Sequence, residues 1–159
     1  MSQSLTVDVQ VACDGEIPAK AIIQKWVSTA LGQSGRSVNR SCEIAVRIVD
    51  AQEIQTLNQL YREQDKATNV LSFPGGEIDG LPGDAARMLG DIVVCAPIIA
   101  REAVEQGKLP ADHWAHMLVH GTLHLLGFDH TNDSEAAEME ALEKSILAAG
   151  NVTDPYQSS

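Results

Sequence analysis

Apolar and polar residues alternate in two stretches of the chain, Leu5 to Val11 and Ile44 to Val49. A period of two residues is that of a β-strand with one buried face. Two shorter runs also predict strands: residues 69–74, which end in a Pro-Gly-Gly turn, and residues 91–95, which are apolar enough for a buried strand. The pattern therefore predicts about four strands.

Five other stretches place apolar residues three and four positions apart, which is the spacing of one face of an amphipathic helix. Pro18 suits the first turn of the first helix. Asp50 followed by Glu53 forms the pattern of a capping box at the start of the second. The predicted helices cover approximately residues 18–32, 50–61, 97–107, 111–126 and 134–149.

Together these elements predict an α+β fold in which a mixed sheet of about four strands packs with about five helices. The length of 159 residues fits one domain that spans residues 1–159. Residues 75–90 lie between two predicted strands and are rich in Gly and Asp. We expect them to form a long loop, of the kind that often has a function.

Composition limits the setting in which the protein is expected to work. The longest apolar stretch, Ile92 to Ala100, contains Pro97 and is far shorter than the roughly 20 residues needed to cross a bilayer. The N-terminus has neither a basic start nor an apolar signal core. The three cysteines are widely separated and lack a Cys-x-x-Cys pair, as in buried thiols of a reducing compartment. We therefore expect a cytoplasmic protein without a membrane segment.

The net charge of -11 argues at first against a nucleic-acid partner, because phosphate binding depends on clustered Lys and Arg. The charge is uneven, however: residues 1–76 carry seven basic and eight acidic groups, and residues 77–159 carry four basic and fourteen acidic groups. Basic residues outnumber acids between Ile17 and Val49. This excess indicates either a basic face on an acidic protein or ordinary solvated helix and strand faces, and charge pattern alone favours the second.

All five histidines lie between His113 and His130, and the last three follow the spacing His-x-x-x-His-x-x-Gly-x-x-His. His120 and His124 are four positions apart, so on a helix their side chains share one face within reach of one cation. Gly127 can end that helix in a left-handed conformation, which lets the chain bring His130 back to the same point. Three neutral imidazoles leave the fourth tetrahedral position of Zn²⁺ open, as in catalytic zinc sites.

Three neighbouring residues carry further expectations. His116 precedes His120 by one turn and is expected either to support the metal site, to face the substrate, or to be an ordinary histidine of the helix face. His113 is expected to be exposed. Asp129 either orients a ligand histidine or shapes the turn after Gly127.

A three-histidine zinc with an open position can activate water and polarise a carbonyl or phosphoryl oxygen, so hydrolysis is the expected reaction class. The histidine spacing equals that of the metzincin peptidases, in which a glutamate general base follows the first histidine. Here that position is Gly121. Because a general base contributes roughly 10²- to 10⁴-fold in rate, its absence argues against peptide hydrolysis.

Four blocks of the chain carry a more specific signal. They are Leu57-Asn-x-x-Tyr-Arg62, Thr68-Asn-Val-Leu-Ser-Phe-Pro74, Leu89-Gly-Asp-Ile92 and Val119-His-Gly-Thr-Leu-His-Leu-Leu-Gly-Phe-Asp-His130. In this order they closely resemble the YbeY family of bacterial endoribonucleases, which has glycine at the position of Gly121. The segment from Glu135 to Tyr156 also resembles the enterobacterial-type member. Two departures are Phe128, where the family often has tyrosine, and Ala67, where proline is frequent.

The resemblance implies a zinc-dependent, single-strand-specific endoribonuclease that helps to mature the 3′ end of 16S rRNA and takes part in 70S ribosome quality control. It implies that His120, His124 and His130 bind one zinc ion per chain. It also implies that Arg62 is the arginine needed for RNA cleavage; without the resemblance, Arg62 would be read as a solvent-facing residue near a helix end. A guanidinium suits this role because its donors can hold a phosphate at two points. The implied partners are single-stranded RNA, the ribosome and assembly factors, with neither DNA nor a membrane expected.

Two alternatives stay open. The first is a metallopeptidase of metzincin-like spacing that uses a residue other than Gly121 as its base. The second is a non-catalytic protein in which the zinc is structural and a basic face binds ribosome-assembly factors or a GTPase.

Overall fold

The structure of the protein is a computed structural model that describes residues 5–13, 17–34, 42–74, 87–128, 132–150 and residue 152. These residues form one four-stranded sheet with the strand order β1-β2-β4-β3. The central pairings β1–β2 and β2–β4 are parallel, and β3 pairs antiparallel with β4 at one edge. The mixed sheet that the sequence predicts is therefore confirmed. Its strands are β1 (Leu5–Val11), β2 (Cys42–Val49), β3 (Val70–Pro74) and β4 (Arg87–Cys95).

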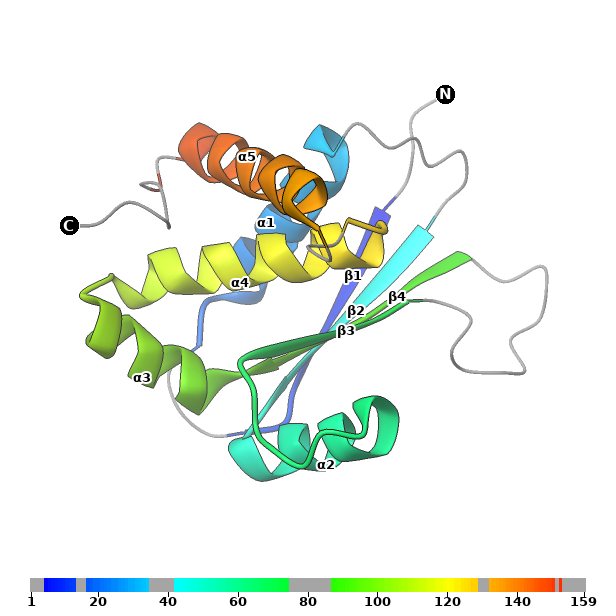
Figure 1. Cartoon of the computed structure of the whole chain (residues 1–159), viewed down its shortest axis with the longest axis vertical. Coiled ribbons are helices and arrows are strands. Elements are labelled where there is room, and N and C mark those ends of the chain that lie inside the picture. The colour runs from blue at the N-terminus through cyan, green and yellow to red at the C-terminus, as the bar shows by residue number, and fades with distance from the viewer. Residues whose placement is uncertain are drawn as a thin grey trace.

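Helices cover both faces of this sheet (Figure 1). One face carries α4, with α1 and α5 beside it, and α2 lies on the opposite face, while α3 follows β4 directly. All five predicted helices are confirmed, with ends that shift by one or two residues. Their bounds are α1 (Lys20–Gln33), α2 (Ala51–Arg62), α3 (Ala96–Gln106), α4 (Pro110–Leu125) and α5 (Asp133–Ala149).

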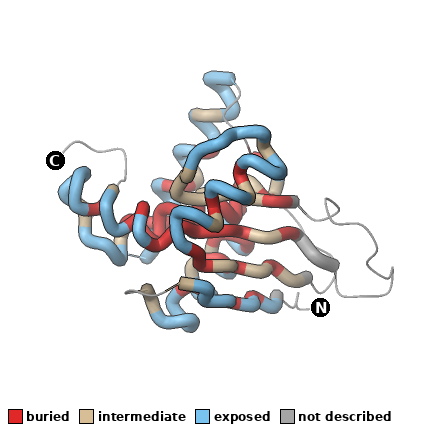
Figure 2. The backbone as a smooth tube through the Cα atoms, turned by 90° about the horizontal axis from the view of Figure 1, so that it is seen from below, coloured by how far each residue is buried: buried red, intermediate tan, exposed pale blue. Residues whose placement is uncertain are grey.

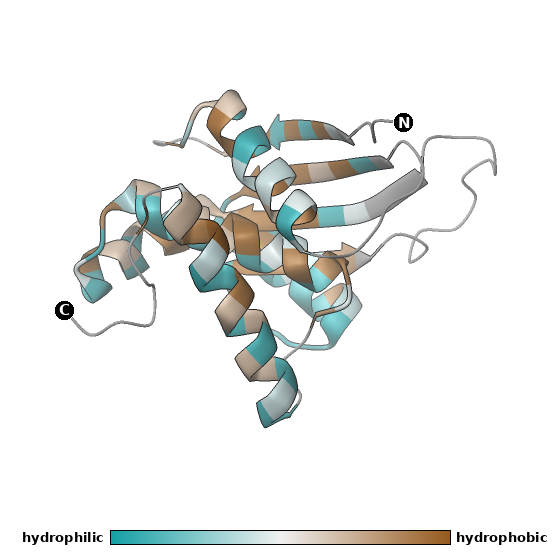
Figure 3. Ribbon diagram, turned by 90° about the horizontal axis from the view of Figure 1, so that it is seen from above, coloured by the Kyte–Doolittle hydropathy of each residue, from teal (hydrophilic) through white to brown (hydrophobic). Residues whose placement is uncertain are grey.

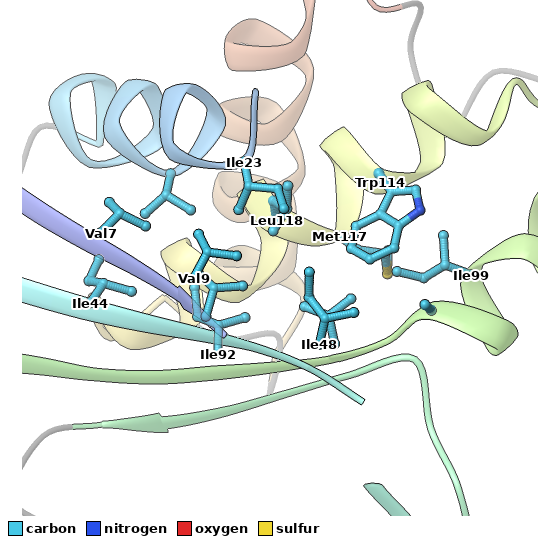
Figure 4. Packing of buried hydrophobic residues seen from close by; sticks show 14 of the residues in the cluster. Val7, Val9, Ile23, Ile44, Ile48, Ile92, Ile99, Trp114, Met117 and Leu118 are labelled. Atoms are coloured by element: carbon cyan, nitrogen blue, oxygen red, sulfur yellow. The ribbon is translucent and has the colours of Figure 1, made fainter. Parts of the chain in front are cut away.

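Helix α4 lies between two parts of the hydrophobic core. Trp114, Met117 and Leu118 pack with the sheet residues Ile48 and Ile92 on one side (Figure 4). On its other side α4 contributes a second set of buried residues, which pack against α5: Ala115, Val119 and Leu123. A helix that is apolar on several sides is stable only when it is buried, and most residues of α4 from His113 onward are buried. Figure 2 shows that the buried residues gather at the centre of the molecule.

Strands β1 and β2 show the alternation of buried and more exposed residues that their sequence predicts. Hydrophobic and hydrophilic residues alternate along β1 and β2 (Figure 3), and Val7 and Val9 are buried while Thr6 and Asp8 are exposed. The opposite face of the sheet has a smaller core under α2, which contains Ile54 and Phe73. The sheet is thus covered on both faces, and its two faces carry different parts of the predicted site.

Strand β4 begins at Arg87, four residues before the predicted start at Asp91, so the prediction of a loop over 75–90 is wrong for residues 87–90. The reason is a shift of the β2–β4 register between Glu43 and Ile44, which β4 accommodates next to Gly90 with φ 149°. Glycine tolerates this conformation at a β-bulge within a strand. The sequence pattern predicts a loop there because glycine is also typical of turns. Residues 75–86 lie outside the described residues.

The start of α2 shows half of the predicted capping box. The Asp50 side chain accepts a hydrogen bond from the backbone N–H of Glu53 at 2.9 Å. The Glu53 carboxylate pairs instead with Arg47 of β2, whose Nε lies 2.6 Å from Glu53 Oε2. Arg47 therefore adds little net positive charge to the basic stretch of the N-terminal half. Among the described helices, none is long and apolar enough to span a membrane.

Candidate metal centre

Four histidines form a row along α4. His113, His116, His120 and His124 are three or four positions apart, and their successive ring centroids are separated by 6.2, 6.2 and 4.5 Å. His113 and His116 are buried, whereas His120 and His124 are partly exposed. The row therefore runs from the protein interior to an accessible position near the C-terminal end of the helix.

His120 and His124 approach each other as a pair of metal ligands does. Their Nε2 atoms lie 3.1 Å apart. Two nitrogens bound to a tetrahedral Zn²⁺ at the usual Zn–N distance are separated by about 3.3 Å. The two imidazoles that the sequence predicts to share a cation are thus brought together in a geometry that fits one.

The turn after α4 also has the predicted form. Gly127 adopts φ 96°, its N–H donates to the carbonyl of His124 at 3.1 Å, and the N–H of Phe128 donates to the carbonyl of Leu123 at 3.1 Å. These two hydrogen bonds define a Schellman motif, and Leu123 and Phe128 pack in the same core cluster. The chain thus reverses immediately after the histidine pair. The predicted third ligand, His130, and Asp129 lie outside the described residues, so their roles stay predictions.

Glu143 of α5 is the residue that sequence analysis missed. Its side chain is 1% exposed, and its two carboxylate oxygens contact two different histidines. Oε1 lies 2.8 Å from Nδ1 of His120, and Oε2 lies 2.9 Å from Nε2 of His116. A signal for it exists in the sequence: Glu143 occupies the same buried stripe of α5 as Met139 and Leu147, where an acid is unexpected.

One possible ligand atom from each of His116, His120 and Glu143 lies within 4.8 Å of the other two, so this mostly buried group could also hold a cation. The separations of 2.8 and 2.9 Å are those of charge-assisted hydrogen bonds. A buried carboxylate needs such donors to offset its desolvation. We therefore assign Glu143 as the hydrogen-bond acceptor of the two rings. The contact with Glu143 occupies Nδ1 of His120, and the other ring nitrogen, Nε2, faces His124.

His113 is buried, which makes the prediction that it is exposed wrong. Its side chain is 2% exposed, and its Nε2 lies 2.9 Å from Oε1 of Glu102 on α3. Burial lowers the pKa of His113, and this effect outweighs the opposing effect of Glu102. The sequence pattern could not show this burial, because it depends on how α3 packs against α4.

Arg62 lies at the last turn of α2, at the edge strand β3. Its Nη2 donates to the carbonyl of Ser72 at 2.7 Å, its Nη1 donates to the carbonyl of Tyr61 at 3.3 Å, and its guanidinium carbon is 4.7 Å from the centroid of the Phe73 ring. The carbonyls and the ring are neutral, so they orient the guanidinium without cancelling its charge. The residue is half-buried and held in place, and is not the freely solvated side chain that its position near a helix end indicates.

Ser72 connects Arg62 to the histidine helix. Its carbonyl accepts the hydrogen bond from Arg62, and its hydroxyl donates to the carbonyl of Gly121 at 2.9 Å. Gly121 directly follows His120. One residue of β3 therefore links the guanidinium on the α2 side of the strand to the turn of α4 that carries the candidate metal ligands.

Gly121 faces the sheet and not the histidine row. A Cβ atom there would lie 2.9 Å from Cγ2 of Ile92 and 3.3 Å from Cγ2 of Val70. The helix approaches the sheet so closely that a side chain at this position would force the two apart. A side chain at position 121, where metzincins carry their base, would meet the sheet, so the base of the peptidase alternative would have to come from another residue, as that alternative assumes.

Comparison with known proteins agrees with this picture. The family model described as endoribonuclease YbeY matches residues 10–151. The endoribonuclease YbeY of Halorhodospira halophila is 52% identical over 153 residues, which cover 96% of this chain and 97% of that protein. The proteins of the same name from Xanthomonas euvesicatoria and Colwellia psychrerythraea are 54% and 45% identical, over 88% and 94% of this chain and 85% and 96% of their own lengths.

The fold has a solved counterpart. The solution structure of a Thermotoga maritima protein superposes with a TM-score of 0.54 at 22% sequence identity, covering 96% of this chain and 99% of the other. At this identity the likeness concerns the fold alone. The family assignment depends on the sequence relatives, which match nearly the whole chain at about half of its positions. The chain belongs to the endoribonuclease YbeY family, as its four sequence blocks predict.

Proposed function

We propose that this protein is a zinc-dependent, single-strand-specific endoribonuclease that acts as one domain in the cytoplasm. We further propose that it matures the 3′ end of 16S rRNA and takes part in 70S ribosome quality control, with the ribosome and assembly factors as partners. The observation that carries the proposal is the 3.1 Å distance between the Nε2 atoms of His120 and His124. Ser72 of β3 connects the backbone next to this pair with Arg62. The names of the relatives supply the reaction class.

The zinc would be held by His120 and His124, together with His130. The described pair fits this role because the two Nε2 atoms lie 3.1 Å apart, close to the separation of two nitrogens on a shared ion. A bound Zn²⁺ supplies Lewis acidity toward a phosphoryl oxygen and lowers the pKa of water. His120 and His124 are partly exposed, so the centre is accessible to a polymer substrate.

Arg62 would bind the RNA phosphate. A guanidinium carries five N–H donors in a planar fork, and two of its nitrogens donate to the carbonyls of Tyr61 and Ser72. These contacts fix the plane of the fork before substrate arrives, which lowers the entropy lost on binding. Arg62 can then offset the negative charge that accumulates on the phosphate oxygens as the phosphodiester is attacked.

The test is cleavage of a single-stranded rRNA fragment by purified protein, beside the same sequence in a duplex. The wild-type protein is expected to cut the single strand, to lose activity with a chelator and to regain it with Zn²⁺. His124→Ala should lose zinc and activity together, and Arg62→Ala should lose activity while it keeps zinc. Lys66→Ala, which removes an exposed basic residue four positions beyond Arg62, is the matched control.

Equal cleavage by all of these variants would identify a contaminating nuclease and overturn the proposal. The same panel tests the third ligand, because His130→Ala should lower the zinc content measured by atomic absorption. The ribosomal role predicts that cells depleted of the protein accumulate 16S rRNA with unprocessed 3′ ends. Normal 3′ ends after depletion would remove that part of the proposal.

A further inference from the structure

We infer that Glu143 is a positioning residue of the metal centre: from α5, its carboxylate fixes the ring orientation and the tautomer of His120, with His116 as its second anchor. The inference deepens the proposed function and rests on it for the role of His120 as a zinc ligand. It makes the C-terminal helix part of the metal centre, although the proposed ligands all precede that helix.

The first argument is burial. Glu143 is 1% exposed, and an ionised carboxylate in the protein interior is stable only when charge-assisted hydrogen bonds replace its lost hydration. Its two oxygens contact His120 and His116 at 2.8 and 2.9 Å. Because the two histidines are one helical turn apart on α4, the carboxylate spans that turn, and neither oxygen can swing away without losing a bond.

The second argument concerns the tautomer of His120. A neutral imidazole carries its proton on one nitrogen and offers a lone pair on the other. The Glu143 carboxylate accepts a hydrogen bond from Nδ1, so it favours the tautomer whose lone pair is on Nε2. That Nε2 is the atom 3.1 Å from Nε2 of His124. The carboxylate therefore selects the form of His120 that can bind a cation.

The third argument is the rigidity of the support. Met139, Ile146 and Leu147 surround Glu143 on the buried stripe of α5 and pack in one cluster with Ala115, Val119 and Leu123 of α4. Figure 1 shows α5 lying along the side of α4 that faces away from the sheet. Apolar contacts on either side of Glu143 thus fix the position of its carboxylate relative to the histidine row.

The decisive measurement is zinc affinity, obtained by competition with a chelating dye. Glu143→Gln keeps the shape but removes the charge, and Glu143→Leu removes the acceptor as well. We expect the dissociation constant for zinc to rise by about 10- to 100-fold in both variants, with the larger rise in Glu143→Leu. Glu140→Gln, an exposed position on the same helix, is the control and should bind zinc as the wild-type protein does.

A purely structural role predicts a different result. In that case the thermal stability of the zinc-free protein would change in Glu143→Leu, and the zinc affinity of the folded variants would equal that of Glu140→Gln, which would overturn the inference. If His124→Ala lost zinc while both Glu143 variants kept it, the proposed function would stand without this inference. If the wild-type protein bound no zinc, the proposed function itself would fail.

A second measurement needs no variant. Long-range ¹H–¹⁵N spectra of the zinc-free wild-type protein at pH 8 report which ring nitrogen of His120 carries the proton. We expect the Nδ1–H form. The Nε2–H form, as the major species, would contradict the inference even if the Glu143 variants failed to fold.

Discussion

On the α4 side of the sheet, a buried carboxylate holds His120; on the α2 side, two carbonyl oxygens and an aromatic ring hold Arg62. The first arrangement places an anion beside a group that must stay neutral and present a lone pair. The second places two neutral carbonyls and an aromatic ring against a cation. Each set of contacts orients a side chain for its proposed role.

The two regions also differ in how they depend on the rest of the fold. The histidine row is positioned by α3, α4 and α5, which pack together through apolar clusters. Arg62 is positioned by the end of α2 and by the edge strand β3. Ser72 and Gly121 form the contact between them. A substitution can therefore affect the histidine row, Arg62, or the contact between Ser72 and Gly121. We expect effects of different size on activity and stability in these three cases.

The largest effect on RNA cleavage should come from substitution of Arg62, because its proposed contribution is the positive charge that binds the phosphate. Arg62→Ala is expected to lower kcat for RNA cleavage by about 10²- to 10³-fold, as when a donor to a developing oxyanion is removed. Arg62→Lys keeps the charge but loses the planar fork and should recover only part of the rate. Zinc content should stay at the wild-type level in both. A parallel loss of zinc would show that the two regions are not separable.

Gly121→Ala tests the close contact between the regions. A methyl group 2.9 Å from Ile92 overpacks the core at a cost of about 1–3 kcal/mol, against about 1 kcal/mol gained from helix propensity. We expect a net loss of up to about 2 kcal/mol in the free energy of unfolding, measured with urea. Gly32→Ala near the end of α1, where nothing lies within 4 Å, is the control and should not destabilise the protein. Unchanged stability in Gly121→Ala would show that α4 does not need this approach.

His113 provides a pH test of the buried end of the histidine row. Its pKa is lowered in the folded protein, so the unfolded chain binds the proton more tightly, and stability present above the unfolded pKa of about 6.5 is lost as pH falls below it. Between about pH 7.5 and 5.5, the zinc-free wild-type protein should lose more stability than His113→Gln, as measured by urea unfolding at each pH. An equal loss in both proteins would mean that His113 does not contribute.

Ser72→Ala should give the smallest effect. It removes the hydroxyl that donates to Gly121 but keeps the carbonyl that accepts from Arg62. One neutral hydrogen bond contributes about 0.5–1.5 kcal/mol, so stability should fall by about that amount. Because α4 and β3 also pack directly, RNA cleavage should fall only a few-fold. A loss of rate as large as that of Arg62→Ala would show that this single bond aligns the two regions.

Sequence patterns predicted the parts of this structure that depend on local spacing. The strand and helix periods, the His120–His124 pair and the Gly127 turn all follow from residues a few positions apart. The contact between Glu143 and His120 joins residues 23 positions apart, and an acid on a helix is read as exposed unless its partners are known. The burial of His113 and the anchoring of Arg62 likewise depend on α3 and β3, which only the tertiary fold brings near.

The position of β3 as the last strand of the sheet has a consequence for the shape of the substrate. Ser72 of this strand contacts Arg62 through its carbonyl and the backbone of α4 through its hydroxyl, and β3 has a free side in the described sheet. A polymer that reaches both the proposed cation ligands and the guanidinium would therefore pass across the edge of the sheet. A flexible unpaired chain can bend at such an edge at little cost, whereas a stiff double helix resists sharp bending.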